Sequence, residues 1–280
     1  MNLILKLYTM KFILTYIIIG ISFLSAQTNG TFNQKKLDTS NILIEYDFLF
    51  LKDSLKKDRK TYSIKQLFIG ENYSVFGDMY LFKSDSILKL AVNNNTHEYD
   101  DVLLETYLSI KNKDYIIKNN KNNNYIFQSK VYTYNFQFEE ELPKLKWTLE
   151  NERMDYNGYN LKKAKTYYGG REWIAWYCEE VPFNNGPYLF NNLPGLIFII
   201  KDKDENFNYK LTSIKKIEKE ITIRDDESII KTDKKSFIKT NKNYHNNPDI
   251  FVNTKSYDSP NVESNLIYNK KIPYNPIELE

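Results

Sequence analysis

The residues best suited to metal chemistry are few in this chain. His97-Glu98-Tyr99-Asp100-Asp101 gathers potential ligands, but a closed metal site needs three or four ligands that converge in space, usually several of them His or Cys. The only other histidine, His245, lies in a polar, asparagine-rich stretch. Acids at the start of a helix explain the cluster without a metal, because they offset the positive end of the helix dipole. We therefore expect neither a metal nor another cofactor.

Cys178 is the only cysteine and thus the only thiol nucleophile to consider. A reactive cysteine needs an accessible, electropositive setting. Cys178 instead follows Trp176-Tyr177 and precedes Glu179-Glu180. We expect it to be a small buried hydrophobic residue, in a chain without an internal disulfide.

Acidic clusters leave one enzymatic alternative open, a hydrolase that uses carboxylates alone. Two-carboxylate chemistry needs neither His nor Cys, but it needs two acids that converge in a cleft. Glu139-Glu140-Glu141 and Asp225-Asp226-Glu227 are runs of consecutive residues, which cannot all face one site on a strand. Solvated turns explain them better. The sequence also has no nucleophile elbow, phosphate-binding glycine loop or zinc helix, so a non-enzymatic role is favoured.

The elements that would position any site are mainly strands. Apolar residues alternate with polar ones over 42–50, 132–138 and 207–211, which is the period of a strand with one face in the core. Shorter runs at 62–69, 73–82, 113–118, 124–129 and 159–168 read as further strands. Helical signal is confined to 99–109 and to 233–242, where Asp233 is the expected cap. This pattern predicts a mostly β fold: a curved antiparallel, half-barrel-like sheet with one or two short helices.

Two segments break the alternation. Arg171 to Cys178 carries Trp, Ala and Tyr on one face and Ile, Trp and Cys on the other, and Leu196 to Ile200 is apolar throughout. A strand with two apolar faces must be covered on both. A helix or loop of the same chain is the favoured cover, and an apolar ligand held in the concave face of the sheet is the other.

The stretch between these strands has the most particular order in the chain. Gly186-Pro187 and Pro194-Gly195 frame a short loop that leads directly into Leu196–Ile200. Leu193-Pro194-Gly195-Leu196 fits a type II turn, in which Gly supplies the positive φ. The loop is predicted to be rigid and apolar, and it contains no group that could do chemistry.

This loop and its flanks resemble the GLPGLI family of exported proteins from Bacteroidota. The signature reads Asn192-Leu193-Pro194-Gly195-Leu196-Ile197, with Asn192 in place of the first glycine, a substitution that suits a residue of positive φ. The ending Asn275-Pro276-Ile277-Glu278-Leu279-Glu280 also looks like that of the family. The resemblance implies an exported envelope protein. The family has no established activity, so no catalytic residues are carried over.

Arg171 is one of four arginines and is the first residue of the doubly apolar strand. It either holds a buried carboxylate or a ligand head group bidentately, or is an ordinary rim charge. If the concave face or its loop binds a ligand or partner, the expected binding residues are those that line it: Arg171, Trp173, Trp176, Tyr188, Phe190, Leu193, Pro194 and Gly195.

The N-terminus indicates export. Lys6 and Lys11 precede an apolar run from Phe12 to Leu24, and Ser25-Ala26-Gln27 then offers a cleavage site, which is the layout of a signal peptide. We expect a signal peptide at 1–26, an antiparallel β domain at 27–224 and a polar C-terminal extension at 225–280 that wraps the same domain. No membrane span is expected after cleavage.

Charge and location narrow the function. The formal net charge is only +3, and the leader supplies two of the lysines, so nucleic acid is not an expected partner. The sequence predicts an exported protein of the periplasm or cell envelope, or a secreted one, that binds an apolar ligand or a partner protein without catalysis. A structural accessory role at the outer membrane, read through an exposed Tyr188-Leu189-Phe190 loop, remains a further alternative.

Overall fold

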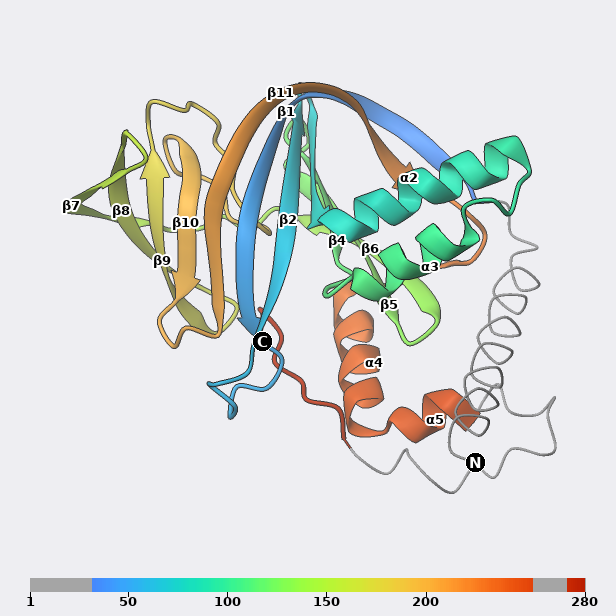
Figure 1. Ribbon diagram of the computed structural model, residues 1–280. Coiled ribbons are helices and arrows are strands. Elements are labelled where there is room, and N and C mark those ends of the chain that lie inside the picture. Colours follow the sequence, from blue (N-terminus) through green and yellow to red (C-terminus); the bar gives the residue numbers. More distant parts are fainter. Residues whose placement is uncertain (1–31, 254–270, 280) are drawn as a thin grey trace, which may run out of the picture.

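The computed structural model describes residues 32–253 and 271–279, and the expected signal peptide lies outside these ranges. One open sheet of twelve strands dominates the described chain, in the order β12-β6-β5-β4-β3-β2-β1-β11-β10-β9-β8-β7 (Figure 1). Neighbouring strands are antiparallel, except that β12 runs parallel to β6. The expected curved, mostly β fold is confirmed. The strands are β1 Gln34–Leu51, β2 Lys60–Gly70, β3 Tyr73–Asp78, β4 Tyr115–Asn119, β5 Asn124–Val131, β6 Tyr134–Glu141, β7 Thr148–Tyr156, β8 Tyr159–Tyr168, β9 Arg171–Cys178, β10 Leu196–Asp202, β11 Phe207–Arg224 and β12 Ile229–Lys231.

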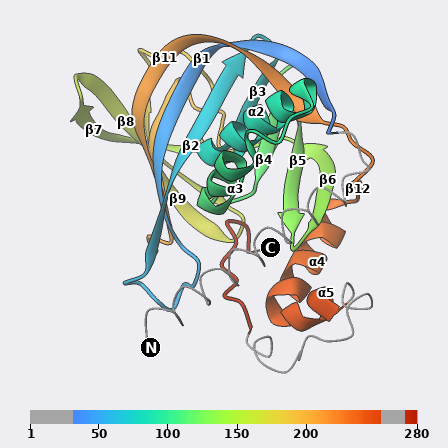
Figure 2. The ribbon, with the colours of Figure 1, turned by 45° about the vertical axis from the view of Figure 1, so that its right-hand side comes forward.

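The sheet curves because its two longest strands leave its plane together. β1 pairs with β11 from Gln34–Arg224 to Phe50–Phe207, whereas its pairing with β2 stops at Ser40–Gly70. Irregularities in register near residues 36–46 bend the ribbon, as β-bulges do. Figures 1 and 2 show β1 and β11 arching over the rest of the sheet. The far end of the arch crosses β4 and β5, where Tyr115 and Gln128 donate hydrogen bonds to the carbonyls of Thr222 and Arg224.

Four helices occur in the described ranges: α2 Met79–Asn94, α3 Asp100–Ser109, α4 Lys234–Asn246 and α5 Pro248–Asn253. The helices expected at 99–109 and 233–242 are thus present as α3 and α4, and Asp233 caps α4 by accepting from Ser236 N. The strand expected at 73–82 is wrong beyond Asp78. There the Asp78 carboxylate accepts from Tyr80 N and starts α2. None of the helices in these ranges is both long and apolar enough to cross a membrane.

The sheet separates two apolar clusters. The larger one fills the concave face with residues from β1 to β11 and with Phe237 of α4. The smaller one lies on the other face, where Phe82 of α2 packs with Phe68, Tyr115 and Ile221. Rings stack across the concave face, as between Phe48 and Tyr209, whose centroids are 4.1 Å apart.

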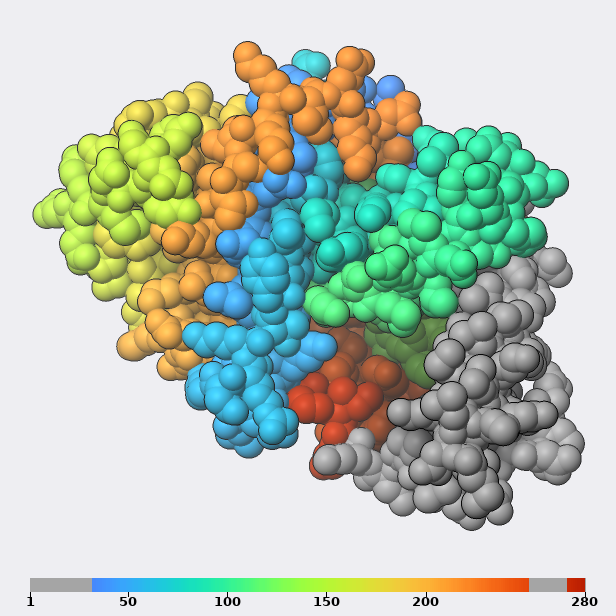
Figure 3. All heavy atoms as spheres, in the orientation of Figure 1, coloured from blue at the N-terminus to red at the C-terminus, as the bar shows by residue number. Residues whose placement is uncertain are grey.

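The C-terminal region returns to the same sheet. β12 pairs with β6, α4 packs on the concave cluster, and residues 271–279 lie against β1 and β8–β9. Asn275 donates to the Leu51 carbonyl, and Leu279 N donates to the Gly169 carbonyl. In Figure 3 the red C-terminal segment sits beside the blue β1–β2 hairpin, below α3.

Candidate functional site

The loop between β9 and β10 fills the concave face. Tyr188, Leu189, Phe190 and Leu193 are all buried, and the Phe190 ring lies 4.6 Å from that of Trp173 on β9. The chain itself therefore covers this side of the doubly apolar strands, as a loop was expected to do. An exposed Tyr188-Leu189-Phe190 surface, on which the accessory-subunit alternative depended, is not present.

Gly195 holds the loop against β9. Its φ is +154°, and a Cβ built there would lie 2.0 Å from the Cys178 carbonyl oxygen. The expected type II turn is wrong, because Gly195 N donates to Leu193 O within a tighter turn, while Leu196 N donates to Val181 O. Asn192 has a φ of +66°, which asparagine tolerates better than most residues.

The opposite face of β9 and β10 is less well covered. Ile174, Trp176 and Ile199 are half-buried there, and the Lys163 ammonium lies 5.9 Å from the centre of the Trp176 ring. Lysine side chains from neighbouring strands can cover such apolar surface. The expectation of full cover on both faces is thus met on the concave side and only in part on the other.

Arg171 is not an ordinary rim charge, because it pairs with a buried carboxylate. It is 8% exposed and lies 3.4 Å from Asp202. Its remaining donors bind the C-terminal segment, at the carbonyls of Pro276 and Ile277 and the side chain of Asn275. The guanidinium thus fastens residues 275–277 to β9 and β10.

The eight predicted binding residues do not line one open cavity. Trp173, Tyr188, Phe190, Leu193 and Gly195 lie in the packed concave face or its loop. Trp176 is on the other face, Pro194 is exposed, and Arg171 is occupied by the C-terminal segment. Their role in binding stays a prediction.

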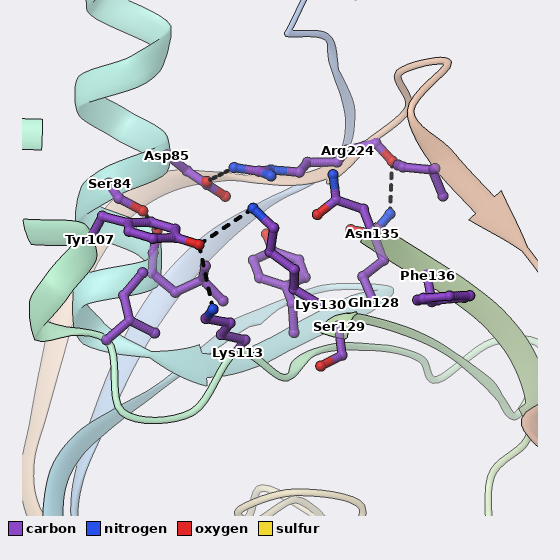
Figure 4. A pocket seen from close by; sticks show the side chains of 14 residues that line it. Ser84, Asp85, Tyr107, Lys113, Gln128, Ser129, Lys130, Asn135, Phe136 and Arg224 are labelled. Carbon is purple, nitrogen blue, oxygen red and sulfur yellow. Dashed lines mark hydrogen bonds and ion pairs between the residues drawn. The ribbon is translucent and has the colours of Figure 1, made fainter. Parts of the chain in front are cut away.

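An open site exists on the other face of the sheet, which sequence reasoning missed. We call it the outer pocket. α2, α3 and the segment that follows them form one wall, β4–β6 form the floor, and the end of β11 closes the far side (Figure 4). Its polar residues come from elements far apart in sequence, and no local motif joins them. The titratable residues that interact with one another there are Asp85, Tyr107, Lys113, Lys130 and Arg224.

Two lysine side chains converge on Tyr107 of α3 in this pocket. Its hydroxyl accepts hydrogen bonds from Lys113, at 3.4 Å, and from Lys130 of β5, at 3.3 Å (Figure 4). Burial alone would raise the pKa of Tyr107, but the charges and hydrogen bonds of Lys130 and Lys113 outweigh it and lower the pKa. Within the described part of the chain, neither lysine has a carboxylate within ion-pair distance.

Asp85 is the acid that lines this pocket, and it is already neutralised. It is 6% exposed and forms an ion pair with Arg224 at the end of β11. Burial raises its pKa despite the opposing effect of Arg224. The remaining wall is apolar and half-buried, formed by Leu81, Ile110, Phe136 and Ile229.

The arrangement does not favour the other chemistries considered. The outer pocket and another pocket, beside the β9–β10 loop, are each lined by a single acid, Asp85 and Glu71 respectively, so neither of these two holds a carboxylate pair. Cys178 is fully buried, and burial raises the pKa of its thiol. In the described ranges no group of three or more His, Cys, Asp or Glu side chains could hold a metal ion.

Comparisons with known proteins agree with a domain of unassigned role. The model of a family described as "Protein of unknown function (Porph_ging)" matches residues 124–199, from β5 into β10. No curated protein matches the sequence. Among solved structures, the chain is similar to PNGF-II in its P21 and C2 crystal forms, with 14% and 15% identity and TM-scores of 0.46 and 0.47. The match covers 73% of this chain but only 33% and 32% of those chains, so this chain spans about a third of their length.

Proposed function

We propose that this chain is an exported, non-catalytic binding protein of the cell envelope whose outer pocket takes a small ligand with an apolar body and an anionic head group. The observation that carries the proposal is the pair Lys113 and Lys130, which converge on one neutral phenol. A carboxylate accepts hydrogen bonds from ammonium groups more strongly than a phenol does. The two lysines would therefore bind an anionic ligand more strongly than they bind the Tyr107 hydroxyl in the free protein.

The rest of the pocket supports an amphipathic ligand. Leu81, Ile110, Phe136 and Ile229 supply apolar contacts, and Asp85 is held by Arg224, so it does not oppose an incoming anion at full charge. Binding pockets commonly combine an apolar lining with a few convergent polar groups. The concave face, filled by the loop at 188–193, offers less room for a ligand.

Export is part of the proposal and has separate support. The first 26 residues have the layout of a signal peptide, and the resemblance to exported GLPGLI proteins points the same way. A carboxylate hydrolase has less support, because each of the two pockets is lined by one acid and such an enzyme needs two.

Calorimetric titration with hexanoate and with hexanol tests the binding site. Hexanoate should bind and hexanol should bind much more weakly, because only the carboxylate can engage the lysines. Lys113→Met and Lys130→Met should each weaken hexanoate binding by about tenfold, the effect of losing one charge-assisted hydrogen bond. Lys83→Met, at an exposed position of α2 outside the pocket, is the matched control and should change nothing. Equal binding of the alcohol, or full binding by both pocket variants, would refute the proposal.

A further inference from the structure

A second pocket, of unusual composition, is lined in part by the β9–β10 loop. Seven of its fourteen lining residues are asparagines, contributed by β1, the β4–β5 turn and the loop itself. We call it the asparagine groove. Its rim amides are exposed, at Asn41, Asn120, Asn123, Asn184 and Asn192, whereas Asn185 and Asn191 are buried in its floor.

Asn191 lines the floor of this groove and has an unused hydrogen-bond acceptor. The residue is 6% exposed, and its Oδ1 atom is buried without a hydrogen-bond partner among the described residues. Trp147 holds its backbone in place by donating from Nε1 to the Asn191 carbonyl at 2.7 Å. A buried acceptor without a partner costs free energy, so the position favours any molecule that brings a donor to it.

Lys118 brings less positive charge to the floor of the groove than an ordinary lysine would. It is 1% exposed, and its Nζ donates to Asn185 Oδ1 at 2.7 Å and to the Gly186 carbonyl at 2.9 Å. Two acceptors satisfy both N–H groups of a neutral amine, and within the described ranges no carboxylate pairs with this lysine. Burial lowers the pKa of Lys118 to about 7. Glu71 on the rim is the acid of the groove, so an anionic ligand is disfavoured.

We propose that the asparagine groove binds a short, neutral, polyhydroxylated chain, such as an oligosaccharide. Side-chain amides offer donors and acceptors side by side, which matches hydroxyl groups, each a donor and an acceptor. The exposed rim amides bind the ligand hydroxyls, and the buried Asn191 side chain turns about its last torsion so that one hydroxyl donates to Oδ1. Half-buried Phe183 supplies an apolar surface for the C–H face of a sugar ring.

A polypeptide fits these observations less well than a polyol does. Peptide groups would pair with the amides, but the side chains of a peptide need apolar recesses of their own. The groove gives half of its lining to amides, and its apolar residues are Ile69, Leu142, Pro182 and Phe183. The density of hydrogen-bonding groups therefore favours a ligand that has a hydroxyl on nearly every carbon.

The experiment is saturation-transfer NMR and calorimetry on the full mature chain, with maltotriose, cellotriose and the neutral peptide acetyl-trialanine amide. At least one trisaccharide should bind. Asn191→Leu and Phe183→Leu should each weaken that binding by about tenfold, as the loss of one hydrogen bond or one ring contact implies. Asn151→Ala removes an exposed amide of β7 outside the groove and should have no effect. Lys113→Met in the outer pocket should also leave sugar binding unchanged, so this proposal can stand or fall without the first.

Four outcomes would overturn the proposal: no binding of either trisaccharide, binding of the peptide alone, full binding by Asn191→Leu, or an equal loss in Asn151→Ala. Thermal unfolding of each variant checks folding. Asn191→Leu removes an unpaired buried acceptor and should therefore melt no lower than the wild-type chain.

Discussion

The carbonyl oxygen of Cys178 occupies the space that a side chain at residue 195 would need. A Cβ on Gly195 would lie 2.0 Å from that oxygen and 2.9 Å from the Cα of Glu179. The end of β9 and the start of β10 therefore touch backbone to backbone. This contact closes the loop that carries Phe190 and Leu193 into the concave face.

Gly195→Ala should destabilise the fold by more than about 3 kcal/mol, since a backbone shift must accompany a strained φ. Denaturant unfolding measures the change. Gly158→Ala is the matched control: its φ is +84°, but nothing lies within 4 Å of the added carbon, so the cost should stay near about 1 kcal/mol. Equal losses in both variants would show that the contact with Cys178 is unimportant.

Lys118 should make stability depend on pH. In the folded chain its pKa is lowered to about 7, while the ordinary value is 10.5. Between these pH values the unfolded chain binds the extra proton and the folded chain does not, so the free energy of unfolding rises with pH across that window. Lys118→Met should flatten this rise when unfolding is measured from pH 6 to pH 10. If the variant kept the full slope, the pH dependence of the unfolding free energy would come from other titratable groups.

Arg171 should fasten the C-terminal segment. Arg171→Met leaves Asp202 buried, with hydrogen bonds only from Asn206 and from Phe207 N among the described residues, and should cost about 3–5 kcal/mol. Hydrogen exchange at Leu279 N, which donates to the Gly169 carbonyl, should accelerate at the same time. The double variant with Asp202→Asn should cost less than the sum of the two single changes, because the unpaired buried charge is then removed. Strict additivity would contradict a coupled pair.

Strands such as β1 were predictable because burial follows the alternation of their own side chains, as at Ile44, Tyr46 and Phe48. α2 was not, because Tyr80 and Phe82 continue the apolar alternation of β3. The bond from Tyr80 N to Asp78 caps the helix that forms instead, and Phe82 packs from it against Phe68.

In the sites, too, single residues could be predicted from the sequence but their partners could not. The rarity of arginine pointed to Arg171, but its partner Asp202 depends on the pairing of β9 with β10. In the outer pocket, Asp85 and Arg224 are 139 residues apart and meet only because the β1–β11 ribbon arches over the sheet. The periodicity of the sequence also could not show whether a loop or a ligand fills the concave face, because either would bury the same side chains.

The central claim is that ligand binds at Tyr107 and not in the concave face. The most direct measurement is NMR of the chain with 13C-labelled tyrosine Cζ during titration with hexanoate. The account predicts that the Tyr107 signal moves and saturates, and that the pKa of Tyr107, lowered in the free protein by Lys130 and Lys113 against the effect of burial, rises when a bound carboxylate takes up their charge. Movement of the concave-face signals of Tyr46 and Tyr209, with Tyr107 unchanged, would contradict it.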